Sequence, residues 1–243
     1  MEIRGERACT DCDATWSYFE TASIVCPVCG SADTVARTDE RAVHTDAPVD
    51  LDLTPVRGLI DEVPREELTD AAAETCREYV RRRGFVSGGD LRDLDDTYLA
   101  ARELVGAADV VRRARSLTED EEWYFFELLR GADAGDRPEP AAVPSSMRAV
   151  RGLADANAVE TYRRDVRRWL DATEDAPGAE NARAVLQTVA EHDRRVRALQ
   201  GDVPPAEAAA LVAAVRAVGS YLRSEDPDGL ARARKLLSNL DGA

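Results

Sequence analysis

The sequence predicts a mainly α protein with a small β segment at its N-terminus and a helical bundle after it. Two observations carry this prediction. Four cysteines, together with aromatic and β-branched residues, lie within the first 36 residues, and this composition favours short strands. From about residue 64 onward, apolar residues recur at the three- and four-residue spacing of amphipathic helices.

The pattern divides the chain into a cysteine segment, an extended linker, a helical domain and an alanine-rich unit of three helices. The bounds of these four segments are 1–36, 37–63, 64–170 and 171–243. In the linker, Val49, Leu51 and Leu53 alternate with aspartates, which predicts one half-buried strand and the last strand of the chain. At 243 residues, the chain is long enough to bury a sizeable core.

Short strands are expected in the cysteine segment. The stretch "TWSYFE", residues 15–20, is rich in aromatic residues and predicts a strand. We expect residues 23–25 to return antiparallel to it, and residues 34–35 to add a third strand.

The rest of the chain predicts helices at about 65–83, 94–115, 178–199, 205–223 and 227–240, and a further helix that Ser145 or Ser146 caps and that leads into the stretch "GLADANAVETYRRDVRRWL". Thr118 and Glu121 have the spacing of a capping box, which opens a further helix. That helix carries "WYFFELL" and is apolar almost all round, so it is expected at the centre of the domain or under a partner. Trp123 and Phe126 are therefore candidate contacts for a partner protein.

The composition is acidic, with 47 Asp and Glu residues against 32 Lys and Arg residues and a net charge of −15. Lys235 is the only lysine. Hydrated carboxylates and few lysine stems are typical of salt-adapted proteins, so we expect a halophilic origin. At molar salt the Debye length falls to about 3 Å, and net charge then says little about partners.

The N-terminal stretch has no apolar core of the kind a signal peptide carries. No stretch reaches the ~18 uninterrupted apolar residues of a membrane span. We therefore expect a cytoplasmic protein without a membrane partner, in which thiols stay reduced. Paired cysteines in that compartment indicate metal ligands rather than disulfides.

The four cysteines form two C-x-x-C pairs, Cys9 with Cys12 and Cys26 with Cys29, with 13 residues between the pairs. Two residues between thiolates let one tight turn direct both sulfurs at a single ion, and two such turns complete a tetrahedron. In the second pair, Gly30 supplies the positive φ that the turn needs, and Asp13 takes that place in the first pair. This pattern predicts Zn²⁺, with iron as the alternative metal. A redox dithiol would need a βαβ pattern around one C-x-x-C, and none is seen.

The spacing resembles that of zinc ribbons over about 30 residues, and the resemblance implies a closed, structural Cys₄ site. Longer stretches also resemble a family, namely "TWSYFE", "CPVCG", "VHTDAP", "RRRGFVSGGDL", "LDDTYLAARELVGAADVV" and "LLRGADAG". They are similar to uncharacterised haloarchaeal zinc-ribbon proteins of unknown function, over about residues 8–170. That resemblance supports halophilic origin and implies no activity.

Three aromatic residues follow the first cysteine pair. Trp16 and Tyr18 are expected to pack over the metal turns, although an exposed stacking platform is the alternative. Phe19 falls on the other face of the predicted strand and is the best candidate on this segment for a partner contact, unless it docks the segment on the helices.

Arginines gather in four clusters along the chain, within residues 81–83, 112–115, 163–168 and 194–197. Most lie near predicted helix C-termini, where they offset the helix dipole. If the helices converge, the clusters line a groove for nucleic acid, with Arg81, Arg82 and Arg83 as the candidate contacts. Against this, residues 1–36 hold six acidic residues and two arginines, and nucleic-acid binding normally needs a basic footprint.

The function predicted from these features is a zinc-binding protein whose structural Cys₄ ribbon is attached to a helical domain that contacts an unidentified protein. The alternatives are an RNA- or DNA-associated factor that uses the arginine clusters, and a rubredoxin-like iron electron carrier. His44 and His192 are the only histidines, and neither belongs to a nucleophile–base arrangement. An enzymatic activity is therefore not favoured, and an enzyme with a polar site in the helical domain stays open as a further alternative.

Overall fold

The computed structural model describes residues 2–174, 176 and 178–241. The first part is the cysteine segment (residues 2–36). Its elements are β1 (Glu2–Ile3), β2 (Glu6–Cys9), β3 (Thr15–Ser17), α1 (Tyr18–Thr21) and β4 (Thr34–Ala36). The strand β5 (Ala42–Val43) follows and pairs with β1.

The second part is the helical body (α2–α9). Its helices are α2 (Thr54–Arg57), α3 (Arg65–Arg82), α4 (Asp96–Arg113), α5 (Glu119–Gly131), α6 (Arg148–Ala172), α7 (Ala179–Ala198), α8 (Pro205–Leu222) and α9 (Gly229–Leu240). A hairpin of β6 (Val86–Ser87) and β7 (Asp90–Leu91) lies between α3 and α4. Three 3₁₀ turns, Ala132–Ala134, Pro140–Ala142 and Ser145–Met147, connect α5 to α6. The predicted fold class, mainly α with a small N-terminal β region, is confirmed.

Local sequence signals set several of the helix boundaries. The Asp95 side chain caps α4 by accepting a hydrogen bond from the Tyr98 amide at 2.7 Å, as short polar residues do at helix N-termini. Thr118 and Glu121 form the predicted capping box at the start of α5. α3 carries acidic residues in its first turn and arginines in its last, which complements the helix dipole.

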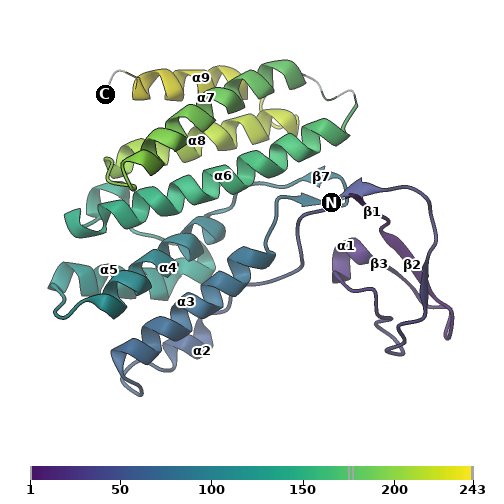
Figure 1. The fold of residues 1–243 in the computed structure, drawn as a ribbon, viewed down its shortest axis with the longest axis horizontal. Coiled ribbons are helices and arrows are strands. Elements are labelled where there is room, and N and C mark those ends of the chain that lie inside the picture. The colour runs from purple at the N-terminus through teal and green to yellow at the C-terminus, as the bar shows by residue number, and fades with distance from the viewer. Residues whose placement is uncertain (1, 175, 177, 242–243) are drawn as a thin grey trace.

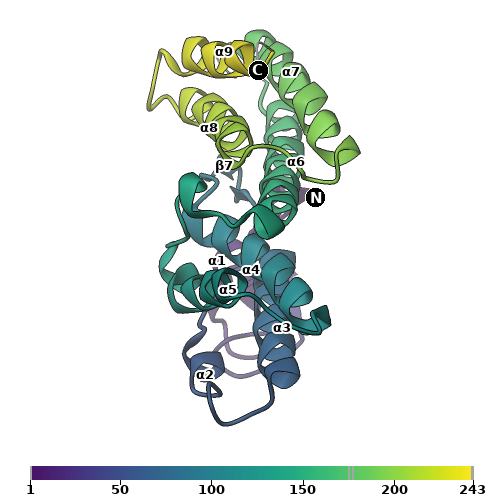
Figure 2. The same cartoon turned by 90° about the vertical axis from the view of Figure 1, so that its left-hand side faces the viewer.

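The long helix α6 holds the body together. It packs against α4 on one side and against α7 and α8 on the other, so that α3, α4 and α5 lie across it from α7, α8 and α9 (Figures 1 and 2). One continuous set of buried apolar residues runs from Val43 to Leu240 through this arrangement. Gly106 allows α4 to approach α6 closely, because a Cβ there would lie 2.8 Å from a methyl group of Val150.

The cysteine segment lies beside the body, near the β6–β7 hairpin (Figure 1). Its sheet has the order β3-β2-β4, with Arg7 opposite Trp16 and Ala8 opposite Val35. The strand at 34–36 agrees with the prediction, but residues 23–25 are not a strand and that prediction was wrong. Ser17 caps the short helix α1 by accepting from the Phe19 amide, so the chain turns away before a return strand is reached.

The predicted strand at Val49–Leu53 was also wrong. Leu51 and Leu53 are buried, as the alternation indicated, but the stretch is extended without a strand partner. The Leu53 amide donates instead to the Asp133 carboxylate at 3.1 Å. Among the described residues, the last strands are those of the β6–β7 hairpin, where Gly88 and Gly89 both have positive φ and form its turn. Within the described part of the chain, no helix combines the length and the apolar character needed to cross a membrane.

Candidate metal centre

The four predicted ligand cysteines stand in two tight turns of the cysteine segment. The first turn is closed by a hydrogen bond from the Cys9 amide to the Ala14 carbonyl at 2.9 Å, and the second by one from the Cys26 amide to the Ser31 carbonyl at 2.9 Å. The residue after each second cysteine has positive φ, 57° at Asp13 and 75° at Gly30. Both turns therefore have the same backbone form, which directs each pair of sulfurs to one point.

The sulfur atoms of Cys9, Cys12, Cys26 and Cys29 all lie within 4.8 Å of one another and could hold a metal ion. The Sγ atoms of Cys9 and Cys29 are 3.5 Å apart, and those of Cys12 and Cys26 are 3.6 Å apart. A disulfide needs about 2.05 Å, whereas a tetrahedron of thiolates about 2.3 Å from one ion places its sulfurs about 3.8 Å apart. The spacing therefore fits a four-coordinate metal and not a pair of disulfides.

Backbone amides favour the anionic form of three of these thiols. The Ala14 amide acts on Cys12, the Ser31 amide acts on Cys29, and the Cys29 and Val28 amides act on Cys26. The Cys29 amide is the largest influence that lowers the pKa of Cys26, which falls to about 7. At Cys12 the Ala14 amide is opposed by the neighbouring thiols and by desolvation, which together raise the pKa to about 12. Four adjacent thiols cannot all ionise on their own, and a bound cation removes this conflict.

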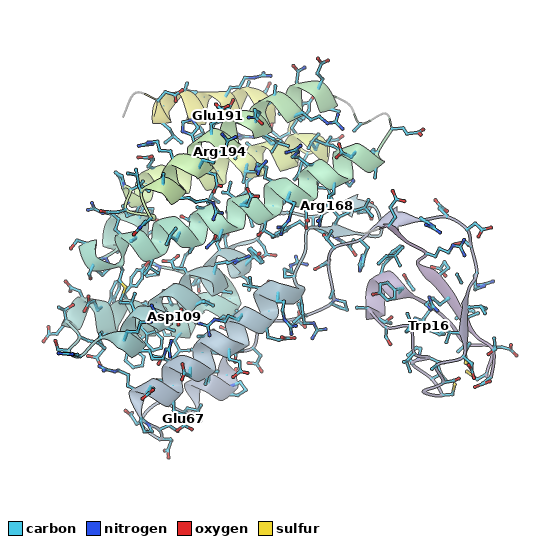
Figure 3. All side chains as sticks on the ribbon, viewed as in Figure 1. Trp16, Glu67, Asp109, Arg168, Glu191 and Arg194 are labelled. Atoms are coloured by element: carbon cyan, nitrogen blue, oxygen red, sulfur yellow. The ribbon has the colours of Figure 1, made fainter. Side chains whose placement is uncertain are left out.

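A small core supports the two turns. Cys9, Trp16 and Cys26 are buried together, with Ala14 packed against them, and this cluster is separate from the core of the body. The Trp16 indole donates to the Ser23 carbonyl at 3.1 Å. Trp16, labelled in Figure 3, thus packs beside the metal turns as expected and is 8 % exposed. Tyr18 does not, because its ring meets His44 edge-on at 5.8 Å.

Phe19, a predicted partner contact, faces the rest of the chain. Its ring packs against His44 at 5.0 Å. A Cβ placed on Gly5 or on Gly88 would lie 2.1 Å or 2.8 Å from that ring, so both glycines make room for it. Phe19 therefore docks the cysteine segment onto the hairpin of the body.

The two other predicted partner contacts, both on α5, differ in exposure. Trp123 is 45 % exposed. Phe126 is partly buried against the core and meets Phe125 at 5.4 Å. The helix is expected to be apolar almost all round and to lie at the centre of the domain or under a partner, but only one face of it is buried, formed by Tyr124, Phe125, Leu128 and Leu129. Of the two predicted residues, Trp123 alone is left largely in solvent.

The three arginines at the end of α3 do not share one surface. Arg81 contacts Glu78, and Arg83 forms ion pairs with Asp46 at 2.7 Å and with Asp95 at 2.9 Å. Arg82 donates to the Pro48 carbonyl and is absent from the cavity that Arg81 and Arg83 line. That cavity also includes arginines of α4 and α6.

Sequence reasoning missed two residues of these sites. Arg102 stands alone in the sequence and so belongs to none of the arginine clusters, but it lies in the cavity. His44 was considered only as a ligand or a base, yet it packs between Tyr18 and Phe19 and accepts from the Gly88 amide at 3.3 Å. No local pattern identifies either role, because Arg102 meets Thr161 from 59 positions away and His44 meets Gly88 from 44 positions away.

These features define a mainly α protein with an N-terminal cluster of four thiols suited to a metal ion. Comparison of its sequence with known protein families assigns the chain to one of them. The chain belongs to a family of unknown function, DUF7117, whose model matches residues 1–237. No curated protein and no solved structure matches the chain.

Proposed function

We propose that the protein binds one zinc ion through Cys9, Cys12, Cys26 and Cys29, and that this ion has a structural role. The observation that carries the proposal is the set of four sulfurs within 4.8 Å of one another. Four protein thiolates complete the coordination of zinc and leave no position for water or substrate, as in structural zinc sites. Zinc binding supplies about 10–16 kcal/mol in small domains of this kind, and the segment's three-residue core is too small to replace it.

Metal analysis of the purified protein tests this proposal. We expect about one zinc per chain and no absorption band in visible light, because zinc has a filled d shell. Cys12→Ser should lose the metal. Cys76→Ser should keep it, because Cys76 lies in the core of the body, where burial raises its pKa to about 12. One iron per chain with a visible thiolate-to-iron band would favour the electron-carrier alternative, and soluble folded protein without metal would exclude both.

We further propose that the cysteine segment contacts a protein partner through the surface near its second metal turn. Four of the six large apolar side chains that are exposed in the described chain belong to this segment, namely Ile24, Val25, Val28 and Val35. Val28 is 75 % exposed. Exposed apolar residues that gather in one small region mark interaction sites, and the segment's acidic charge disfavours nucleic acid as the partner.

Affinity purification at high salt, with and without nuclease, tests the second proposal. Val28→Glu should abolish co-purification of the partner and leave the metal content unchanged. Leu199→Glu is the matched control, because Leu199 is also exposed, at 48 %, but lies at the end of α7 in the body. A partner that is lost with Leu199→Glu and kept with Val28→Glu would place the interaction on the body instead.

A further inference from the structure

A cavity of about 730 Å³ lies between α3, α4 and α6 on the helical body. Seven arginines and two acidic residues, Asp109 and Asp165, line it, although the whole chain has a net charge of −15. Asp109 on α4 and Arg168 on α6 are labelled in Figure 3. Members of three of the four sequence clusters of arginine meet here, and we call this cavity the arginine groove.

The two acidic residues of the arginine groove are already engaged. Asp109 is shared by Arg77 at 2.9 Å and Arg113 at 4.0 Å, and it also pairs with Arg112 outside the groove. Asp165 accepts from the Thr45 hydroxyl at 2.7 Å and from the Phe85 amide at 3.0 Å. These bonds orient the Asp165 carboxylate toward Thr45 and Phe85, and its negative charge is paired with Arg168 at 3.5 Å.

Arg102 has no acidic partner in this arrangement. It is half-buried and donates to two neutral groups, the Tyr98 hydroxyl at 2.8 Å and the Thr161 hydroxyl at 3.3 Å. Its guanidinium lies 5.2 Å from the centre of the Tyr98 ring. Among the described residues, no carboxylate forms an ion pair with it. A half-buried cation without a counter-charge is costly, and an anion in the groove would remove that cost.

Two further arginines extend this positive site along α6. Thr161, Arg164 and Arg168 are spaced by three and four residues and line the groove together, as residues on one helix face do. Arg164 is exposed and forms no ion pair within the described part of the chain. Arg168 reaches only a long contact of 3.5 Å with Asp165. Arg102 and Arg164 therefore offer two guanidinium groups that form no ion pair within the described residues, and Arg168 adds a third that is paired with Asp165 at 3.5 Å.

The remaining lining indicates the size and character of the ligand. Val105, Val150 and Leu153 form an apolar part of the same groove. The volume lies within the range of about 300–1,000 Å³ that is typical of small-molecule sites. Single-stranded nucleic acids bind to exposed aromatic rings, but the aromatic residue of this lining, Tyr98, is fully buried. A small ligand therefore fits the arginine groove better than a nucleic-acid strand.

We propose that the arginine groove binds a small phosphorylated compound. Its phosphate groups contact Arg102, Arg164 and Arg168, and its less polar part lies against Val105, Val150 and Leu153. Guanidinium groups match phosphate because their donors form a planar fork that binds two oxygens at once. This proposal goes beyond the structural zinc site and does not depend on it, because no residue of the cysteine segment lines the groove.

Calorimetric titration of the full-length, metal-loaded protein tests the proposal, with ATP, inorganic pyrophosphate and adenosine as probes at one fixed ionic strength. We expect ATP or pyrophosphate to bind and adenosine not to bind. Tighter binding of ATP than of pyrophosphate would support contact between the organic part and the apolar lining, and tighter binding of pyrophosphate would overturn that contact. Arg164→Gln and Arg102→Gln should each weaken binding about tenfold or more, because a hydrogen bond to a charged group contributes about 1.5–3 kcal/mol.

Arg167→Gln is the matched control, because Arg167 is exposed on the same helix but does not line the groove. It should bind the probes like the wild type. Circular dichroism checks that the variants fold, and the exposed position of Arg164 keeps one variant informative if Arg102→Gln is unstable. Three outcomes would overturn the proposal: no binding of either phosphate probe, equal weakening by Arg167→Gln, or tighter binding of a short single-stranded RNA than of ATP.

Discussion

The cysteine segment and the helical body differ in the size of the apolar core that each one buries. The segment buries three residues in a core of its own, Cys9, Trp16 and Cys26, and two of them are candidate metal ligands. The body has one core that extends through all its long helices, and this core continues into a buried ionic network. In that network Glu103 of α4 meets Arg151 of α6 at 2.8 Å and Arg137 at 3.0 Å.

The difference in buried apolar area is the reason for assigning a stabilising role to the zinc site that we propose. A short segment cannot bury enough surface to offset its conformational entropy, and the zinc ion that we propose takes the place of a core. The body has enough length to bury apolar side chains at about 25 cal/mol per Å². It can therefore also tolerate buried charges, provided that they are paired.

Loss of one metal ligand should have the largest effect and should be confined to the segment. We expect Cys26→Ser to remove the metal and with it most of the ~10–16 kcal/mol that such a site supplies. Hydrogen exchange should show loss of amide protection in β2, β3 and β4, while α4 and α6 keep theirs. Loss of protection in α4 and α6 as well would mean that the two regions fold as one unit.

Breaking the ionic network should have the next largest effect and should be confined to the body. Glu103 is fully buried and also accepts from the Tyr124 hydroxyl, so Glu103→Ala leaves Arg151 and Arg137 short of a counter-charge. We expect urea unfolding to show a loss of about 3–5 kcal/mol in the free energy of unfolding, with unchanged metal content. The exposed Glu78 is the control, since Glu78→Ala should change that free energy by about 0.5 kcal/mol or less.

A change at the contact between the two regions should have a smaller effect. Phe19→Ala removes the ring that packs against His44, Gly5 and Gly88. Because Phe19 is only half-buried, we expect a cost of about 1–2 kcal/mol, less than for a core phenylalanine. Hydrogen exchange at the Gly89 amide, which donates to the Val43 carbonyl, should become faster while the metal content stays the same. Unchanged exchange there would show that β1 and β5 hold the regions together without Phe19.

The smallest expected effect is a pH dependence at the same contact. Burial lowers the pKa of His44 below its ordinary value of 6.5, and Asp46 opposes this shift. Above that ordinary pKa the imidazole is neutral in both the folded and the unfolded chain. As the pH falls below it, the unfolded chain takes up a proton first, so the free energy of unfolding decreases down to the lowered pKa.

A His44→Gln variant isolates this contribution from that of the thiolates. Wild type and variant should differ in the pH dependence of their unfolding free energy between about pH 7 and pH 5, with the steeper decrease in the wild type. The acid sensitivity of the metal ligands is common to both proteins and cancels in the comparison. Parallel profiles would show that the environment of His44 does not favour its neutral form.

Local chemistry made most of the secondary structure predictable. The capping box at Thr118, the arginines at the end of α3 and the bounds of α8, predicted at about 205–223, each depend on a few neighbouring residues. The cysteine spacing likewise indicated the candidate ligands, because the two-residue interval and the positive φ at Asp13 and Gly30 are properties of each turn. The strand predictions at residues 23–25 and at Val49–Leu53 were wrong because strand pairing is not a local property. Whether an extended stretch such as Val49–Leu53 pairs depends on a partner strand, which local pattern does not reveal.

The sequence by itself determined the fold class, the helices and the four candidate thiolate ligands, because periodicity and ligand spacing act over a few residues. The tertiary structure decided which residues from distant parts of the chain lie close together. It turned Phe19 toward Gly88 instead of toward a partner, and it separated Arg82 from Arg81 and Arg83. It also brought Arg102 and Arg164 into one groove from helices about sixty positions apart. Such contacts follow from how three helices pack around one another, and no single stretch of the chain encodes that packing.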